Sequence, residues 1–242
     1  MNAIQILLLI LYAFICGLDM IWVTATGIWR PLVAGAVTGL ILGDPATGVT
    51  AGALVEFTFL GVFMLGGGSV PEASSGTITA TSLVITAALA PQAAVAIAWP
   101  VAAFAMNFEI ATRSFDAVFI HWADRIAPTG NVRLINLVNI LGAVPWALSR
   151  AIPVALFLLI GVPAIQAFLA FTPAIFWTAL TTAGSLMPAC GIAALFNTMY
   201  RAEFIPLFLF GFALAAYLKL PMLGIALVAA GLVGGLYVIR RK

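Results

Sequence analysis

Glu56 is an ionisable residue inside an apolar run, Leu54-Val55-Glu56-Phe57-Thr58-Phe59-Leu60. Placing a charged side chain in hydrocarbon costs roughly 2.5–3.5 kcal/mol on insertion scales, so such residues are candidates for function by default. The carboxylate must find a hydrogen-bond donor, stay protonated or face water. A hydroxyl of a bound sugar is one such donor, and a hydrogen bond to a neighbouring helix is the structural alternative. We predict that Glu56 lies in the membrane interior beside a solute path.

The segment Gly66–Gly76 holds four glycines and a proline in eleven residues, which predicts backbone that is not helical. Irregular backbone at membrane depth is tolerated only where it is buried or lines a wet cavity, and transporters build solute sites from broken helices. We therefore predict a re-entrant turn in which Gly67, Gly68, Ser69 and Glu72 contact the solute. An ordinary loop between two spans is the alternative.

A stripe of hydroxyl residues follows this segment. Ser75, Thr79, Ser82 and Thr86 are spaced by four, three and four residues, which stacks them on one face of a helix. The stripe could extend the polar surface of the turn, with Ser75 reaching the solute. It could equally form hydrogen bonds between helices, as small hydroxyl residues commonly do in membranes.

Two amide residues near the ends of apolar stretches, Asn107 and Asn197, are further candidates, with Glu109 close to the first of them. An amide both donates and accepts, which suits sugar hydroxyls, although each amide could simply tie helices together. His121 lies in a polar stretch beside Trp122 and is expected to be an interfacial anchor rather than a catalytic base.

No motif for covalent chemistry is present. The chain has no phosphate-binding loop, and its one histidine cannot form a zinc-binding pair. Cys16 and Cys190 lie in apolar segments without metal-type partners, so both are expected to be structural thiols. We therefore expect no catalytic residue, no metal and no cofactor in this chain.

Composition sets the fold class. Hydrophobic residues make up 64% of the chain and charged residues 7%, whereas a soluble domain carries roughly 25% charged residues. The runs are apolar throughout and do not alternate as the strands of a membrane barrel would. We predict an all-α polytopic membrane protein with six to nine membrane-inserted helices, including broken or re-entrant ones, in one domain over residues 1–242.

The expected helices follow the apolar segments, since a span needs about 20 such residues. Ala73–Phe108 could hold one span or a span plus a half-helix, and Ala151–Tyr200 holds two. The remaining segments are Ile4–Val23, Leu32–Leu42, Val49–Leu65, Leu134–Pro145, Phe204–Leu218 and Leu220–Ile239. The first of these is expected to be a retained helix rather than a cleaved signal. A turn is predicted at Gly43–Gly48.

Positive charge is concentrated in two places. Arg240, Arg241 and Lys242 follow the last apolar segment, and arginines are frequent in the polar stretch Arg113–Arg133. The positive-inside bias predicts that both lie on the cytoplasmic side. Nucleic-acid binding is not expected, because no basic surface would supply phosphate contacts.

Several short motifs, in order along nearly the whole chain, resemble one known family. They are Arg30-Pro31-Leu32, Leu42-Gly43-Asp44, Thr47-Gly48, Leu54-Val55-Glu56, Leu60-Gly61, Arg113-Ser114, His121, Ala123-Asp124, Ala151-Ile152-Pro153, Asn197-Thr198-Met199, Pro206, Gly211 and Phe212. The pattern resembles the IIC permease subunit of the mannose–fructose–sorbose family of the bacterial phosphoenolpyruvate-dependent sugar phosphotransferase system.

The resemblance implies a permease subunit of the bacterial inner membrane with a cytoplasmic C-terminus. Such a subunit pairs with a membrane subunit, IID, and cytoplasmic IIA and IIB proteins relay phosphate between histidines. The sugar is phosphorylated by the IIB phosphohistidine as it arrives inside. The resemblance further implies trimers of IIC–IID pairs in which a core moves like an elevator against a V-shaped scaffold.

The sequence leaves the identity of the sugar open between several classes. Asn107 stands where mannose-type members carry glutamine, so a hexose, an amino hexose or an N-acetylated hexosamine is expected rather than mannose in particular. Two other classes of function also remain: a secondary transporter coupled to protons through Glu56, which would move its solute unmodified, and a membrane scaffold that transports nothing.

Overall fold

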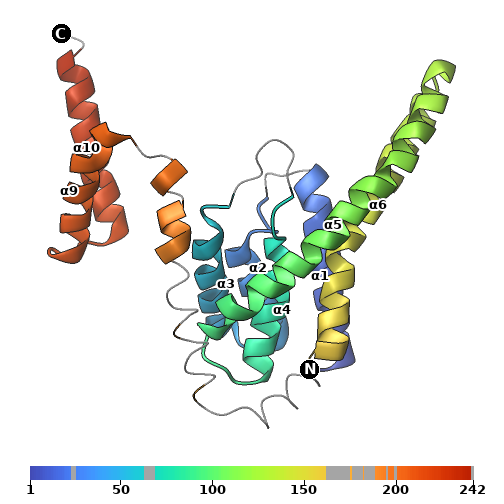
Figure 1. Ribbon diagram of the computed structural model, residues 1–242, viewed down its shortest axis with the longest axis horizontal. Coiled ribbons are helices and arrows are strands. Elements are labelled where there is room, and N and C mark those ends of the chain that lie inside the picture. The colour runs from blue at the N-terminus through green and yellow to red at the C-terminus, as the bar shows by residue number, and fades with distance from the viewer. Residues whose placement is uncertain are drawn as a thin grey trace. The chain divides into compact units, whose positions relative to one another are not determined.

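The computed structural model describes residues 1–22, 26–62, 69–161, 175, 182, 189–194, 196–198 and 201–240. Within these residues all the regular elements are helices, which confirms the predicted fold class (Figure 1). The chain divides into two compact units, Met1–Leu195 and Phe196–Lys242. Much of Ala151–Tyr200, the segment predicted to hold two spans, falls outside the described residues.

The elements of the first unit are α1 (Ala3–Trp22), α2 (Pro31–Leu42), α3 (Pro45–Phe59), α4 (Ala73–Thr86), α5 (Ala93–Ile126), η1 (Ala127–Thr129), α6 (Val132–Leu156) and η2 (Phe157–Gly161). The second unit holds η3 (Ala202–Phe204), α9 (Ile205–Ala216) and α10 (Met222–Arg240). Among the described residues, three helical stretches are long and apolar enough to cross a membrane: Ala3–Trp22, Ala93–Thr129 and Val132–Ile160.

Helices α2 and α3 form a hairpin whose turn is shorter than predicted. Gly43 ends α2 in the left-handed conformation at φ 87°, which favours glycine. Asp44 caps α3 by accepting a hydrogen bond from the Thr47 amide, and Pro45 opens the helix. Hydrogen bonding by Thr47, through its side chain and its amide, holds the pKa of Asp44 below its usual range. The turn is thus confined to Gly43 and Asp44, because the rest of the predicted Gly43–Gly48 turn is helical.

Four glycines let the two helices of this hairpin touch through their backbones. A Cβ built at Gly35 would lie 2.5 Å from the Gly52 Cα, and one built at Gly39 would lie 2.8 Å from the Gly48 Cα. Within α2, Gly35 and Gly39 are four residues apart, and within α3 so are Gly48 and Gly52. Small residues at this spacing allow close approach of helices in membranes.

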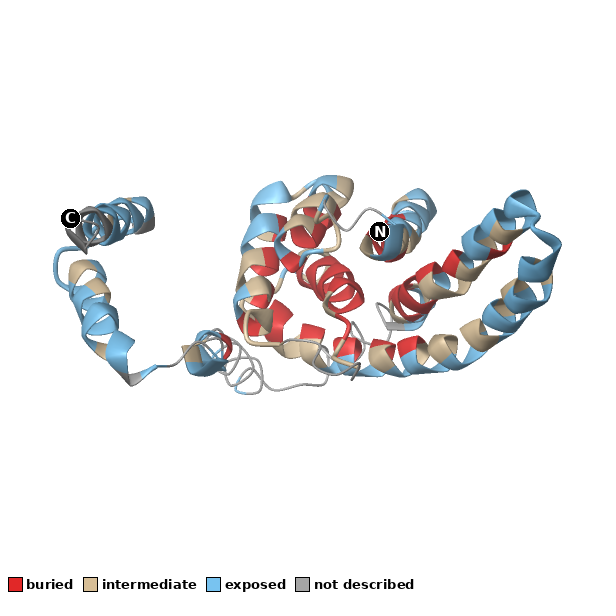
Figure 2. Cartoon of the chain, turned by 90° about the horizontal axis from the view of Figure 1, so that it is seen from above, coloured by how far each residue is buried: buried red, intermediate tan, exposed pale blue. Residues whose placement is uncertain are grey.

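Helix α4 is the buried centre of the first unit (Figure 2). It begins at Ala73, so the prediction of a non-helical segment extending to Gly76 is wrong for its last four residues. The physical reason is a strong N-cap: the Glu72 carboxylate accepts hydrogen bonds from the Ser74 and Ser75 amides. Gly76 is needed for packing, since a Cβ there would lie 2.7 Å from the Ala98 carbonyl of α5.

Helices α5 and α6 are longer than the apolar segments predicted. The polar stretch from Arg113 onward continues as helix to Ile126, so these residues are not a loop. Helix α6 runs without a break through Pro145 and Pro153, where two separate segments were expected. Hydropathy misplaced the boundaries because charged and proline residues are tolerated in a helix whose polar groups find partners on its neighbours.

Candidate functional site

A cavity of about 430 Å³ opens among the N-terminal helices of the first unit, within the range of roughly 300–1,000 Å³ typical of small-molecule sites. Its walls come from α1, the entry to α2, the end of α3, the entry to α4 and the middle of α5. The lining residues are Met20, Trp29, Arg30, Pro31, Phe59, Leu60, Val62, Val70, Pro71, Glu72, Ala73 and Glu109. The cavity therefore combines apolar and aromatic walls with two carboxylates and one guanidinium.

Glu72 reaches this cavity from the N-terminus of α4. Its carboxylate accepts hydrogen bonds from the Ser75 amide at 2.7 Å and the Ser74 hydroxyl at 2.6 Å. The Glu72 amide in turn donates to the Ala102 carbonyl of α5 at 3.0 Å. Helix capping and the contact with α5 thus hold this carboxylate in place although it is almost fully buried.

Arg150 of α6 is a fully buried cation behind the two acids. Its Nη2 donates to Glu109 Oε2 at 3.1 Å, and its Nε lies 4.0 Å from Glu72 Oε1. Its Nη1 donates to the Ser149 hydroxyl at 2.7 Å, and its guanidinium lies over the Trp146 ring at 4.2 Å. A buried charge needs such paired and hydrogen-bonded surroundings. Arg150 therefore joins α4, α5 and α6 through one side chain.

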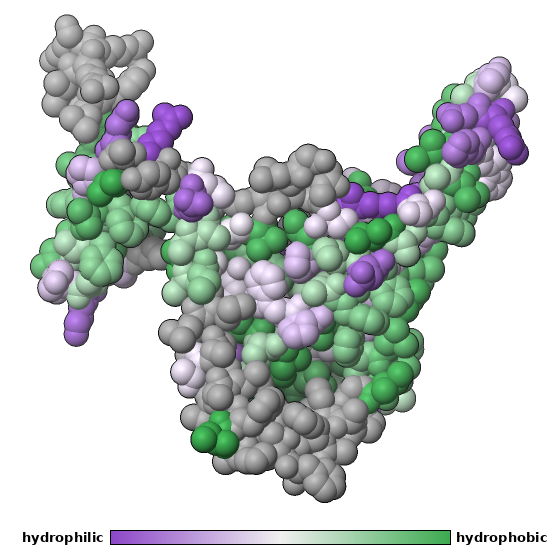
Figure 3. Space-filling model, in the orientation of Figure 1, coloured by the Kyte–Doolittle hydropathy of each residue, from purple (hydrophilic) through white to green (hydrophobic). Residues whose placement is uncertain are grey.

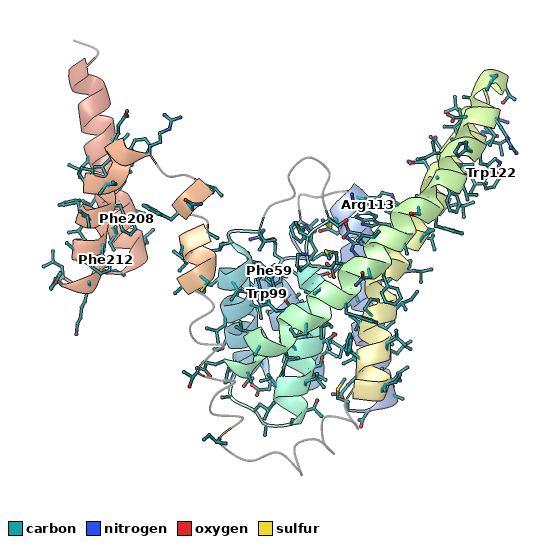
Figure 4. All side chains as sticks on the ribbon, viewed as in Figure 1. Phe59, Trp99, Arg113, Trp122, Phe208 and Phe212 are labelled. Carbon is teal, nitrogen blue, oxygen red and sulfur yellow. The ribbon has the colours of Figure 1, made fainter. Side chains whose placement is uncertain are left out.

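Glu109 is shared between two arginines. Arg113 lies one turn farther along α5 and donates to Glu109 Oε1 at 2.6 Å, while Arg150 takes the other oxygen. Arg113 is about one third exposed (Figure 4). Glu109 is consequently fixed by two arginines with one side toward the cavity.

Glu56 is paired with Arg30 at the edge of the cavity, where the two side chains form a close salt bridge. The second carboxylate oxygen of Glu56, Oε2, accepts a hydrogen bond at 3.2 Å from the amide of Leu32, at the start of α2. Arg30 lines the cavity and Glu56 stands behind it. The donor that this carboxylate requires is thus supplied by the protein itself, 26 residues earlier in the chain.

Aromatic side chains form part of the wall. The rings of Phe59 and Trp99 stack with their centroids 4.6 Å apart (Figure 4), and Trp99 Nε1 donates to the Thr58 hydroxyl. Trp29 lines the cavity, and its buried Nε1 has no hydrogen-bond partner among the described residues. This N–H is enclosed by the protein rather than exposed to the cavity.

The charges around the cavity balance. Three acids, Glu56, Glu72 and Glu109, stand against the three arginines Arg30, Arg113 and Arg150 that pair with them. The described site therefore carries no formal net charge. Such a site suits a neutral solute with many hydroxyl groups better than an ion.

The predicted site residues divide into those at the cavity and those away from it. Glu72 lines the cavity, and Ser69 is half-buried next to the lining residue Val70. Ser75 is buried behind the cavity and donates to the Arg150 carbonyl at 3.2 Å. Gly67 and Gly68 lie outside the described residues.

Asn107 is not among the residues that line this cavity. Asn107 is exposed and donates to carbonyls of its own helix, at Ala103 and Phe104. Asn197 is exposed and belongs to the second unit. His121 is exposed near the far end of α5, and its Nδ1 lies 2.6 Å from the Ala117 carbonyl. Neither Asn107 nor His121 lines the cavity.

The hydroxyl stripe of α4 is packed inside the helix bundle. Ser82 and Thr86 donate to carbonyls one turn earlier in their own helix. Thr79 is fully buried, and its hydroxyl has no partner among the described residues. These side chains do not line the cavity, so their arrangement favours the alternative of packing between helices.

Sequence reasoning did not select Arg150, Arg30 or Trp29. Arg150 directly precedes an uncharged stretch of fifty residues, Ala151–Tyr200, and a cation so close to a long apolar run was a detectable signal. Glu109 was noticed but was not included among the solute contacts. The partners of these residues could not be identified, because they lie on other helices.

Helices of membrane-spanning length around a cavity with buried, paired charges are the architecture of a solute permease. Comparison with known proteins identifies the family within this class. The family model for the sorbose-specific IIC component of the phosphotransferase system matches residues 3–234. The chain belongs to this family of IIC components, as its motifs predict.

Individual relatives agree with this assignment. The fructose permease IIC component of Bacillus subtilis (strain 168) is 34% identical over 224 residues, 93% of this chain and 83% of that protein. A solved structure described as a membrane protein is similar with a TM-score of 0.85 at 30% identity, covering 100% of this chain and 96% of the other. A chain of the mannose transporter ManYZ, solved in complex with microcin E492, is similar with a TM-score of 0.63 at 30% identity. The similarity covers 100% of this chain and 95% of that chain.

Family membership confirms two expectations from the sequence. The chain is a multi-pass membrane protein, and it is a permease subunit rather than an enzyme.

Proposed function

We propose that this chain is the sugar-translocating subunit of a phosphotransferase system and that it recognises a hexose or an N-acetylhexosamine in the cavity beside Glu72 and Glu109. The sugar then passes inward and is phosphorylated by a IIB phosphohistidine. The observation that carries this proposal is the pair of carboxylates, held by Arg150 and helix capping, that face a cavity whose other walls are apolar and aromatic apart from Arg30.

The chemistry of the cavity fits a sugar. Carboxylate oxygens accept hydrogen bonds from hydroxyl groups, and the Arg30 guanidinium, which also lines the cavity, can donate to one. The rings of Trp29 and Phe59 offer apolar surface for the C–H face of a pyranose. Several polar contacts are required, because each buried polar group left unpaired costs about 1–3 kcal/mol.

The proposed partners are a IID membrane subunit and the cytoplasmic IIA and IIB phosphocarriers, in an assembly of three IIC–IID pairs. Support comes from the similarity to the ManYZ mannose transporter and to the fructose permease IIC component. The setting is the bacterial inner membrane with a cytoplasmic C-terminus, and residues 1–242 act as one permease domain. Translocation is of the elevator type, with a core moving against a scaffold.

Proton-coupled transport through Glu56 has less support. Its carboxylate is paired with Arg30 and with the Leu32 amide, so it does not need to take up a proton in order to be buried. A site assembled from balanced ion pairs instead favours recognition of a neutral solute. The two functions differ in one requirement, because only the phosphotransferase mechanism depends on IIB.

The proposal predicts that Glu72→Gln and Glu109→Gln each raise the sugar concentration for half-maximal uptake by about 10- to 100-fold, since a hydrogen bond to a charged group contributes about 1.5–3 kcal/mol. Uptake of radiolabelled fructose, mannose, sorbose and an N-acetylhexosamine is measured in cells that express the complete system. Glu203→Gln is the matched control, because Glu203 is exposed in the second unit.

Omission of IIB from the same cells separates the alternatives. Loss of uptake agrees with the phosphotransferase mechanism, whereas accumulation of free sugar without IIB would establish secondary transport. If both glutamine variants take up every transported sugar with the affinity of the wild type, the cavity is not the sugar site.

A further inference from the structure

The segment Thr26–Arg30, which we call the strap, precedes α2 and forms part of the wall of the proposed sugar cavity. Its residues Trp29 and Arg30 both line that cavity. Gly27 is in the left-handed conformation at φ 69°, and the Arg30 amide donates to the Gly27 carbonyl at 3.0 Å, which closes a tight turn. The direction in which Trp29 and Arg30 point therefore depends on where this turn is held.

One face of α1 holds the middle of the strap. Tyr12, Cys16 and Asp19 are spaced by four and three residues, so they lie on the same side of the helix. The Tyr12 hydroxyl donates to the Ile28 carbonyl at 2.6 Å, and the Cys16 thiol donates to the same carbonyl at 3.5 Å. Ile28 also packs against the apolar core cluster that includes Tyr12 and Cys16. The middle of the strap is thus attached to the buried core of the first unit.

The start of the strap is held by Asp19, in the last turn of α1. This side chain is almost fully buried, and its Oδ1 accepts a hydrogen bond from the Thr26 hydroxyl at 2.5 Å. Its Oδ2 has no hydrogen-bond partner among the described residues. Helix α1 is apolar and of membrane-spanning length, and hydrophilic residues gather elsewhere, at the far end of the α5–α6 hairpin (Figure 3). A buried carboxylate is costly without a donor, so Asp19 favours the position of the strap in which Thr26 reaches it.

The end of the strap is fixed from a different helix. The Arg30 guanidinium forms its salt bridge with Glu56 of α3, while the strap holds the Arg30 backbone against α1. Arg30 is the cation among the described residues that line this cavity. The place at which a solute meets a guanidinium is therefore set jointly by α1 and α3.

We propose that Tyr12 and Asp19 are positioning residues for sugar recognition, because they hold the strap so that Trp29 and Arg30 shape the cavity. This inference rests on the function proposed for that cavity. Neither Tyr12 nor Asp19 lines the cavity, so each acts through the strap. A strap that leaves this position lowers the apparent sugar affinity in proportion to the fraction of molecules still competent to bind. Saturating sugar restores the competent position, so the maximal rate of uptake is unchanged.

Tyr12→Phe and Thr26→Val each remove one hydrogen-bond donor with little change in volume. Each should raise the sugar concentration for half-maximal uptake by about 3- to 10-fold at an unchanged maximal rate, in cells that express the complete system. Thr26→Ser keeps the hydroxyl and should behave as the wild type. Tyr217→Phe and Thr50→Val are the matched controls, because Tyr217 is exposed in the second unit and exposed Thr50 donates within its own helix.

A double variant tests the contact between Asp19 and Thr26. Asp19→Leu and Thr26→Val remove the same hydrogen bond, so their effects on half-maximal uptake should not add when the two changes are combined. Asp19→Leu and Tyr12→Phe remove different bonds, and their effects should accumulate. Additive effects of Asp19→Leu and Thr26→Val would overturn the role of this pair.

Hydrogen–deuterium exchange of the full-length chain in detergent reports on the strap without any sugar. The Arg30 amide is hydrogen-bonded to the Gly27 carbonyl. A peptide that covers this amide should therefore exchange about 3- to 10-fold faster in Tyr12→Phe and Thr26→Val than in the wild type. Exchange in α4 should be the same in every variant, which excludes general unfolding.

The proposal is overturned if exchange in the strap is unchanged in both variants. It is also overturned if exchange rises while half-maximal uptake stays at the wild-type concentration, or if the variants lower the maximal rate alone. Glu72→Gln and Glu109→Gln separate this failure from that of the proposed function. If they weaken uptake and the strap variants do not, the positioning role alone is rejected, whereas no effect in any of these variants rejects the sugar cavity and the positioning role together.

Discussion

At the scale of single residues, Arg150 is the feature that organises the candidate site. It is 1% exposed and contacts both cavity-facing acids from behind. A buried ion pair contributes little net stability compared with a well-packed apolar pair, but removal of one partner leaves an uncompensated charge. Arg150 therefore fixes the positions of Glu72 and Glu109, and its removal alone would leave both acids buried without their shared cation.

Arg150→Met should destabilise the protein by about 3–5 kcal/mol, because Glu109 and Glu72 lose their shared cation. Arg150→Lys keeps the charge but lacks the planar fork, so it should fold and still show weaker sugar affinity. Thermal unfolding in detergent, followed by tryptophan fluorescence, and sugar uptake measure the two effects. Arg133→Met removes an exposed arginine and is the control. Equal unfolding temperatures for Arg150→Met and Arg133→Met would contradict this role.

At the scale of elements, the α2–α3 hairpin shows how helices too short to cross a bilayer alone gain a stable position. The glycines Gly35, Gly39, Gly48 and Gly52 bring the two backbones into direct contact. Such packing depends on van der Waals contact rather than on the hydrophobic effect, which does not act between helices in lipid. The hairpin positions both Arg30, at the start of α2, and Glu56, near the end of α3.

Gly35→Ala should destabilise the protein by about 1–3 kcal/mol, because its Cβ would lie 2.5 Å from the Gly52 Cα and the helices would have to separate. Gly211→Ala in α9 is the control, since no described heavy atom lies within 4 Å of its built Cβ. Thermal unfolding of both variants gives the comparison. Similar unfolding temperatures would show that the hairpin tolerates separation.

At the scale of the whole molecule, topology decides from which side the sugar enters. The prediction from charge bias is that the α5–α6 turn and the C-terminus share the cytoplasmic side. Arg113 belongs to an ion pair with a buried acid, so it is not a suitable marker of the aqueous side. The exposed residues at the turn are better markers.

Single cysteines at Arg125 and at Lys242, in a background without Cys16 and Cys190, should react with a membrane-impermeant maleimide only after the cells are opened. Uptake of sugar by each variant confirms that it is assembled. Labelling of both positions in intact cells would reverse the topology, and labelling of one alone would require an odd number of crossings between them.

The sequence by itself determined the class of the protein and many local features. Low charge and long apolar runs specify membrane helices, and Gly43 and Asp44 mark the end of α2 and the start of α3. The ordered motifs identified the family. These properties are readable because hydropathy, caps and turns depend on residues that are close together in the chain.

Only the tertiary structure decided which residues form the candidate site. Arg150 and Glu109 are 41 residues apart and meet because α5 packs on α6. The Glu72 cap makes Ser74, Ser75 and Gly76 helical, and the interior position of α4 removes its hydroxyl stripe from the cavity. Local patterns carry no information about which face of a helix meets a neighbour, because that choice is made by the packing energy of the whole bundle.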